Sequence, residues 1–215
     1  MKIEYDKTAT IDVDAQKGFT PLCPNELPVP KGDEIVGPLN EHAQFGCLRI
    51  GTKDAHPPGA DWETDEDHPI FSEVGSKNVD IRWPAHCVIG TKGFELLDGL
   101  PPVEDYDFFV YKGVEKNMHP YGNCYHDLEG KISTGLIEFL TYNHIYTVII
   151  GGLATEYCVK TTATQLNEAR FDVIVNLEAC RGLDDNEIFK AITEMEKMGI
   201  SVINGLDALT FLNIL

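Results

Sequence analysis

Short apolar runs alternate along the chain with longer segments in which apolar residues recur every three or four positions. The short runs are typical of buried strands, and the longer segments are typical of amphipathic helices. The runs predict strands at residues 8–14, 47–52, 107–113, 148–152, 171–177 and 200–204. The periodic segments predict helices at residues 32–44, 132–143 and 184–198, and one more that begins at Thr155 and carries Val159, Ala163 and Leu166 on one face.

This alternation predicts an α/β fold, because strands that are joined through helices pair in parallel. We expect a doubly wound, mainly parallel six-stranded sheet with helices on both faces. No internal repeat or low-complexity linker divides the sequence, so we expect a single domain over residues 1–215. Residues 59–92 break the pattern, being acidic and rich in proline and histidine without a clear period. We interpret residues 54–92 as a loop insertion, which at this length is usually functional or disordered, and all the metal ligands that the sequence predicts lie in it.

Composition narrows the classes of function. The 35 acidic and 17 basic residues give a net charge of -18, which argues against nucleic acid or an anionic membrane as a partner. The six cysteines form no CxxC pair, so reduced thiols in the cytoplasm are the simplest expectation. The first residues lack an apolar leader, and no run reaches the length of a membrane span. The sequence is compatible with a homo-oligomer.

The apolar run at residues 148–150 ends at Gly151 and Gly152, and the chain then leads to Cys158. With Thr155 as N-cap, Cys158 would lie in the first turn of a helix, where unpaired N–H groups and the helix dipole favour a thiolate. The same N–H groups could stabilise an oxyanion. The alternative is a buried cysteine that acts only as a small apolar residue.

Reactive side chains follow several of the predicted strands. The carboxyl ends of parallel strands meet at one edge of a sheet, so we expect Asp14, Lys112 and Cys158 to gather there. An acid, a base and a thiol are the groups needed for nucleophilic attack on a carbonyl with proton transfer to a leaving group. Taken singly, Asp14 could be a cap and Lys112 a solvated lysine.

A second group at this edge suits a metal ion. Asp54, His56 and His86 offer one carboxylate and two imidazoles, a ligand set typical of zinc or iron. His68 could supply a further ligand. The carboxylates beside it could also supply one, although most of them are better interpreted as a solvated acidic loop; they are Asp61, Glu63, Asp65 and Glu66.

Five motifs occur in a characteristic order: D-x-Q-x-x-F at 14–19, D-x-H-P at 54–57, W-P-x-H-C-x-x-G-T at 83–91, Lys112-Gly113, and G-L-A-T-E-x-C-V at 152–159. Together they resemble the nicotinamidase/pyrazinamidase branch of the isochorismatase-like cysteine hydrolases. That resemblance covers most of the chain. It implies hydrolysis of nicotinamide to nicotinate and ammonia through a thioester, which would fit NAD salvage.

The resemblance also implies individual roles. Cys158 would be the nucleophile, Asp14 the general base and Lys112 the cation between them. A cis peptide would precede Ala154, and the N–H groups of Ala154 and Cys158 would form an oxyanion hole. The residues expected to contact the substrate are Phe19, Trp83, Tyr121 and Leu153, with Phe19 and Trp83 on either side of its ring.

Asp54, His56 and His86 would hold a divalent metal, Zn²⁺ in first place with Fe²⁺ or Mn²⁺ as alternatives, and the metal would hold the pyridine nitrogen. The family's H-P-x-x-H places a further histidine at residue 60, where this chain has Ala60. His68 could replace it across the insertion or could match a non-ligand H-P of longer members, in which case a carboxylate or water would fill the position. Two alternatives remain: a related amidohydrolase of the same family acting on another small amide, and a non-catalytic homologue that only binds a small molecule.

Overall fold

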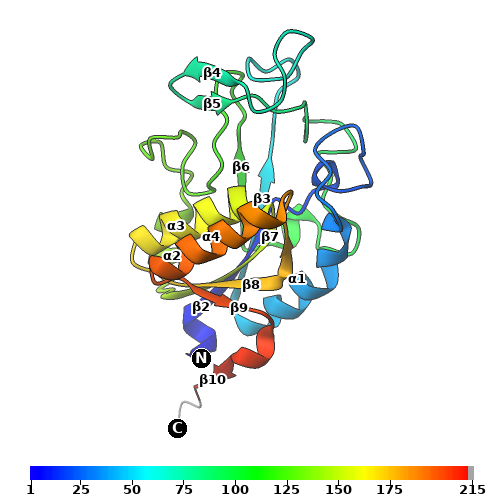
Figure 1. Ribbon diagram of the computed structural model, residues 1–215. Coiled ribbons are helices and arrows are strands. Elements are labelled where there is room, and N and C mark those ends of the chain that lie inside the picture. Colours follow the sequence, from blue (N-terminus) through cyan, green and yellow to red (C-terminus); the bar gives the residue numbers. More distant parts are fainter. Residues whose placement is uncertain (213–215) are drawn as a thin grey trace.

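The computed structural model describes residues 1–212, and its centre is a six-stranded sheet in the order β6-β3-β2-β7-β8-β9 (Figure 1). All neighbouring strands of this sheet are parallel. The strands are β2 (Thr8–Val13), β3 (Leu48–Asp54), β6 (Phe108–Lys112), β7 (Thr147–Leu153), β8 (Asp172–Arg181) and β9 (Ser201–Ile203). The predicted doubly wound α/β sheet is therefore confirmed.

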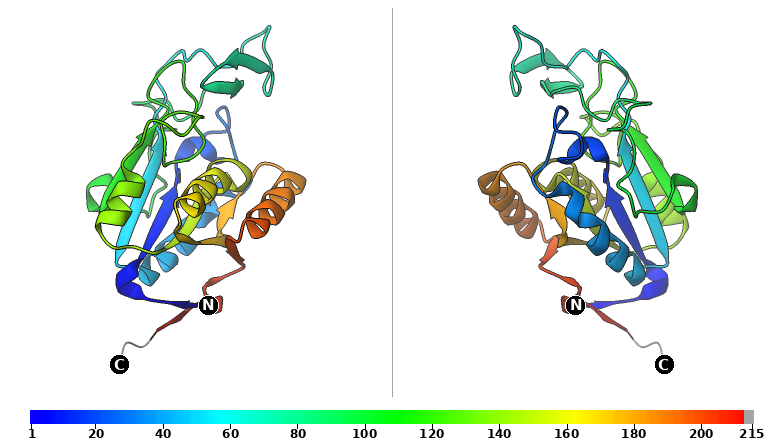
Figure 2. Two further views of the ribbon diagram at one scale, coloured as in Figure 1. Left: turned by 90° about the vertical axis from the view of Figure 1, so that its left-hand side faces the viewer. Right: turned by 90° about the vertical axis from the view of Figure 1, so that its right-hand side faces the viewer.

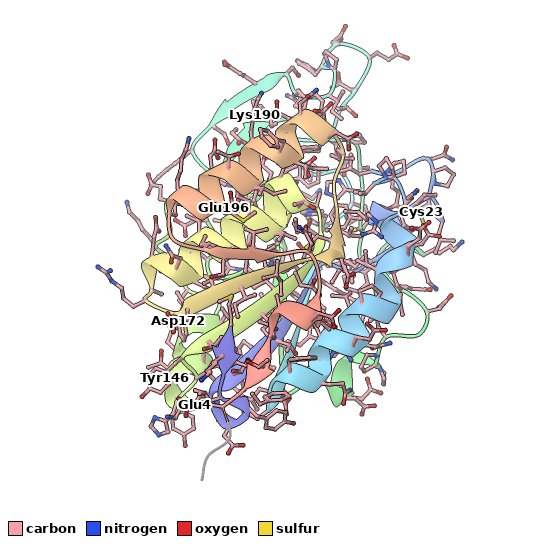
Figure 3. The ribbon with its side chains drawn as sticks, turned by 60° about the horizontal axis from the view of Figure 1, so that its bottom comes forward. Glu4, Cys23, Tyr146, Asp172, Lys190 and Glu196 are labelled. Carbon is pink, nitrogen blue, oxygen red and sulfur yellow. The ribbon has the colours of Figure 1, made fainter. Side chains whose placement is uncertain are left out.

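Helices cover both faces of the sheet, as Figures 2 and 3 show. They are α1 (Val36–His42), α2 (Leu136–Tyr142), α3 (Lys160–Glu168) and α4 (Asp185–Lys197). In Figure 3, α4 with its labelled Lys190 and Glu196 lies on one side of the strands and α1 on the other. One core joins the strands to Leu140, Ala163 and Met195 of α2, α3 and α4, and a second packs Leu39 of α1 against Leu153 of β7.

Several boundaries differ from the predicted ones. The helix expected at 132–143 begins only at Leu136, because the Asp127 carboxylate binds the N–H groups of residues 131 and 132 and Gly135 has a φ of 88°. β8 extends to Arg181, across a register shift opposite β7. Thr155 is not the N-cap: the N–H groups of Tyr157 and Val159 donate to the carbonyl of Ala154, and a π-helical turn (Thr155–Val159) leads into α3.

The insertion is more regular than its sequence indicates. It contains an antiparallel hairpin, β4 (Glu73–Ser76) and β5 (Val79–Ile81), which lies at the opposite end of the molecule from the chain termini (Figure 1). A small core of its own, which includes Trp62, Val79 and Trp83, holds it in place.

The remaining elements are short. A two-stranded parallel sheet pairs β1 (Lys2–Ile3) with β10 (Thr210–Phe211). Single 3-10 turns occupy Tyr5–Lys7, Lys17–Phe19, Gly32–Ile35, Ala43–Phe45, Val103–Asp105 and Leu206–Ala208. No helix within residues 1–212 is long and apolar enough to span a membrane.

Candidate active site

Four neighbouring strands deliver their charged or nucleophilic residues to one edge of the sheet. Asp14 follows β2, Asp54 and Lys112 end β3 and β6, and Cys158 follows β7. One side-chain atom from each of Asp14, Asp54 and Cys158 lies within 4.8 Å of the others. The predicted gathering of these groups at the carboxyl edge is thus present.

Lys112 lies between the other groups. Its Nζ is 3.1 Å from Oδ2 of Asp14 and 3.7 Å from Sγ of Cys158, and it also forms a buried ion pair with Oδ1 of Asp54. Burial alone would lower the pKa of Lys112, but Asp14 and Asp54 raise it well above its ordinary value. Lys112 is therefore a permanent cation beside the thiol.

Asp14 is held by its own strand neighbours. Its φ of 45° is in the left-handed region, and the Thr52 hydroxyl accepts the Asp14 N–H at 3.0 Å and donates to its Oδ1 at 2.6 Å. This leaves Oδ2 facing Lys112. Burial raises the pKa of the Asp14 carboxyl, and Asp54 raises it further, although Lys112 opposes both. Such a carboxyl is suited to accept and return a proton.

The Cys158 thiol does not have the lowered pKa that its helix position led us to expect. Burial raises the pKa of Cys158 well above its ordinary value, and the lowering effect of Lys112 is smaller. The resting group is therefore a thiol, and its proton must be removed as it attacks.

The end of β7, just before the turn that leads to Cys158, requires a glycine. Gly152 has a φ of 137°, and a Cβ there would lie 2.0 Å from the carbonyl oxygen of Val13 on β2. The peptide bond between Leu153 and Ala154 is cis, as the resemblance implies. Ala154 and Cys158 both line the adjacent pocket.

The histidines of the predicted metal site lie beside Asp54. Nδ1 of His56 is 3.0 Å from the carbonyl oxygen of Gly113, and Nδ1 of His86 is 2.6 Å from that of Pro84. Each ring therefore turns Nε2 towards Oδ2 of Asp54, at 3.5 Å for His56 and 3.8 Å for His86. Burial, followed by His56, lowers the pKa of His86 to about 3, so its ring is neutral.

The third histidine at this site is His119, and not the expected His68. His68 is half-exposed on the insertion, with Nδ1 2.8 Å from the Asp65 carboxylate, which keeps it away from the cluster. One nitrogen from each of His56, His86 and His119 lies within 4.8 Å of the others. Sequence reasoning missed His119 because its loop carries no metal motif; its only signal is that this loop follows Lys112 at the same edge.

The residues present fit a divalent metal ion. Nε2 of His56 and both ring nitrogens of His119 are buried without a hydrogen-bond partner within residues 1–212. Backbone carbonyls orient His56 and His86 through their other nitrogen, as is usual for metal-binding imidazoles. The three imidazoles and the free oxygen of Asp54 could hold such an ion.

One pocket is lined both by residues of this cluster and by Cys158. Phe19, Trp83 and Tyr121 line it as expected, whereas Leu153 is not among its lining residues and packs in the core beneath. The Trp83 indole donates to the Tyr121 hydroxyl at 3.1 Å, and that hydroxyl donates to Asp80 at 2.8 Å. Four further lining residues escaped the sequence analysis: Leu27, Val29, Tyr157 and Leu183.

Comparisons with known proteins agree with this geometry. Residues 8–205 match the isochorismatase domain family. A nicotinamidase of Acinetobacter baylyi is 30% identical over 213 residues, which cover 94% of this chain and 94% of that protein.

Two solved structures share the fold. A nicotinamidase/pyrazinamidase of Acinetobacter baumannii superposes with a TM-score of 0.87 at 27% identity, covering 96% of this chain and 100% of the other. A pyrazinamidase of Pyrococcus horikoshii in complex with zinc gives a TM-score of 0.74 at 32% identity, covering 92% and 98%. The chain belongs to the isochorismatase domain family and, within it, to the group of the nicotinamidases.

Proposed function

We propose that this protein is an amide hydrolase that converts nicotinamide and water to nicotinate and ammonia. The observation that carries the proposal is the pocket itself, whose lining includes both Cys158 and the residues Asp54, His86 and His119. A planar nicotinamide ring would lie between Phe19 and Trp83, which both line this pocket, with its carboxamide at the thiol. The relatives named nicotinamidase support this choice of amide.

The first half of the reaction forms a thioester. Asp14 takes the proton from Sγ of Cys158 while the sulfur attacks the carboxamide carbon. The resulting oxyanion would accept hydrogen bonds from the N–H groups of Ala154 and Cys158, and Lys112 offsets the negative charge. The C–N bond then breaks, and the leaving nitrogen takes the proton from Asp14 and departs as ammonia.

The second half regenerates the thiol. Asp14 removes a proton from a water molecule, whose oxygen attacks the thioester carbon. The C–S bond breaks, the sulfur recovers its proton from Asp14, and nicotinic acid leaves and gives its remaining proton to solvent to become nicotinate. The raised pKa of Asp14 suits both directions of transfer, because its protonated and ionised forms are closer in energy than those of an exposed carboxyl.

We further propose that Asp54, His56 and His86 hold a divalent metal ion. Zn²⁺ suits nitrogen ligands with one carboxylate and is present in the Pyrococcus horikoshii pyrazinamidase, while Fe²⁺ and Mn²⁺ are alternatives. When bound, the ion would act as a Lewis acid for the pyridine nitrogen and so orient the carboxamide towards Cys158. The cytoplasm is the proposed compartment, since all six cysteines are unpaired.

Ammonia release from nicotinamide by the zinc-loaded protein tests this function. We expect turnover in the wild type and a loss of at least about a thousandfold in Cys158→Ala, because the nucleophile is removed. The matched control is Cys47→Ala, since Cys47 directly precedes β3, at the end of that strand opposite to Asp54, and forms no part of the pocket. No ammonia from the zinc-loaded wild type would refute the proposal.

A further inference from the structure

His119 carries a buried polar side chain that lies among aromatic rings. It is 4% exposed, and neither of its ring nitrogens has a hydrogen-bond partner within residues 1–212. Its ring packs edge-on against Trp62, with centroids 4.5 Å apart, and lies parallel to Trp83 at 6.0 Å. Burying two unsatisfied nitrogens between aromatic rings costs free energy, so the position calls for a ligand to at least one of them.

The other imidazoles are placed to share that ligand. The His119 ring stacks on His56 with centroids 5.2 Å apart and meets His86 edge-on at 5.7 Å. One ring nitrogen from each of these three histidines lies within 4.8 Å of the others, so the three rings can face a single ion.

The insertion holds His119 in this position. The His119 N–H donates to the carbonyl of Asn78, in the turn between β4 and β5, at 2.9 Å. The Trp62 indole donates to the carbonyl of Met118, the preceding residue, at 3.2 Å. Both hydrogen bonds engage the peptide group that joins Met118 to His119, and they fasten the loop after β6 to the insertion directly beside the imidazole.

We infer that His119 is a direct ligand of the metal ion, completing a set of three imidazoles and one carboxylate with His56, His86 and Asp54. Residue 60 cannot supply a ligand because it is alanine, and His68 lies on an exposed turn, so His119 provides the third imidazole from a different segment of the chain. This inference rests on the metal site of the proposed function, but not on the identity of the amide.

Metal affinity measured without substrate tests the assignment. The full-length protein is stripped with a chelator and titrated with Zn²⁺ by calorimetry, as wild type, His119→Ala, His119→Gln, His56→Ala and His68→Ala. We expect both His119 variants to bind at least about tenfold more weakly, because even indirect contacts to a metal ligand contribute that much. His56→Ala should weaken binding comparably, and His68→Ala should bind as the wild type does.

A Co²⁺-loaded sample gives an independent readout. Loss of one nitrogen ligand should change the wavelength and intensity of the visible d–d bands in both His119 variants and leave them unchanged in His68→Ala. Wild-type Zn²⁺ affinity together with an unchanged Co²⁺ spectrum in His119→Gln would overturn the inference. His119→Ala leaves a cavity beside Trp62 and could unfold at a lower temperature. In that case the test uses the metal affinity and the Co²⁺ spectrum of His119→Gln.

The two proposals can fail separately. His119-dependent metal binding without ammonia release would refute only the nicotinamidase function. Ammonia release with metal affinity independent of His119 would refute only the ligand assignment.

Discussion

At the scale of single residues, the site depends on the burial of opposite charges together. Lys112 contacts Asp14, Asp54 and the Cys158 thiol, and all four side chains are inaccessible or nearly so. A buried cation with two carboxylates carries a net negative charge, which disfavours a thiolate beside it. The arrangement keeps the nucleophile protonated until a substrate carbonyl can receive its electrons.

The alkylation of Cys158 by iodoacetamide should therefore depend steeply on pH. Because the pKa of the thiol is raised, we expect slow reaction at neutral pH and a rate that still increases as the pH rises towards that pKa. Mass spectrometry of the peptide that contains Cys158 measures the rate, with Cys158→Ala to identify signals from the other cysteines. A rate that reaches a plateau below neutral pH would indicate a stable thiolate and contradict the prediction.

At the scale of elements, hydrophobic periodicity predicted the strands and α4 well. Asp184 precedes that helix as its N-cap and accepts the N–H groups of Asn186 and Glu187. The sequence could not predict the hairpin of β4 and β5, because only Val79 among its residues is fully buried and the apolar alternation is weak. The role of His119 was also hidden, since it depends on how two distant loops pack and not on local spacing.

Glu156 connects the turn before α3 to the start of α4. It lies in the π-helical turn before α3, and its Oε1 accepts the N–H groups of Leu183 and Asp184 at 2.7 and 3.2 Å, which fixes the pocket wall at the start of α4. Burial raises the pKa of Glu156, although the backbone hydrogen bonds oppose this. The folded state therefore binds the proton more tightly than the unfolded state does.

The raised pKa of Glu156 determines how its contribution to stability changes with pH. Its contribution to stability is fully present at low pH and is lost as the pH rises from the ordinary carboxyl value through the raised folded-state value. Glu156→Gln keeps an oxygen acceptor and has no charge to desolvate, so its stability relative to wild type should increase over that range. Urea unfolding at a series of pH values measures this, with the exposed Glu194→Gln as control; a difference that is constant with pH would contradict it.

At the scale of the whole molecule, a buried ionic network outside the active site joins two strands of the sheet to helix α1. Asp12 on β2 accepts from Nε and a terminal nitrogen of Arg49 on β3 at 2.9 and 2.7 Å, and from the Tyr106 hydroxyl at 2.9 Å. Its other oxygen is 3.1 Å from Nε2 of His42 at the end of α1. Asp12 is 1% exposed, so these partners replace all of its hydration.

Removing this carboxylate should destabilise the fold. Asp12→Ala leaves Arg49, His42 and Tyr106 without their acceptor, and we expect the free energy of unfolding to fall by about 3–5 kcal/mol. Asp172→Ala, at the exposed start of β8, should change it by less than about 0.5 kcal/mol. Denaturant unfolding compares the two, and equal stabilities would show that the network contributes little.

The parallel sheet also determines when the site can form. The contacts of Lys112 with Asp54 and Cys158 span 58 and 46 residues of chain, and each becomes available only after a long crossover has closed. Loop closure of this kind slows folding, whereas single helices form rapidly from local contacts. The nucleophile, its cation and its proton acceptor therefore meet late in folding, and a newly made chain can have helices well before it has any chemistry to perform.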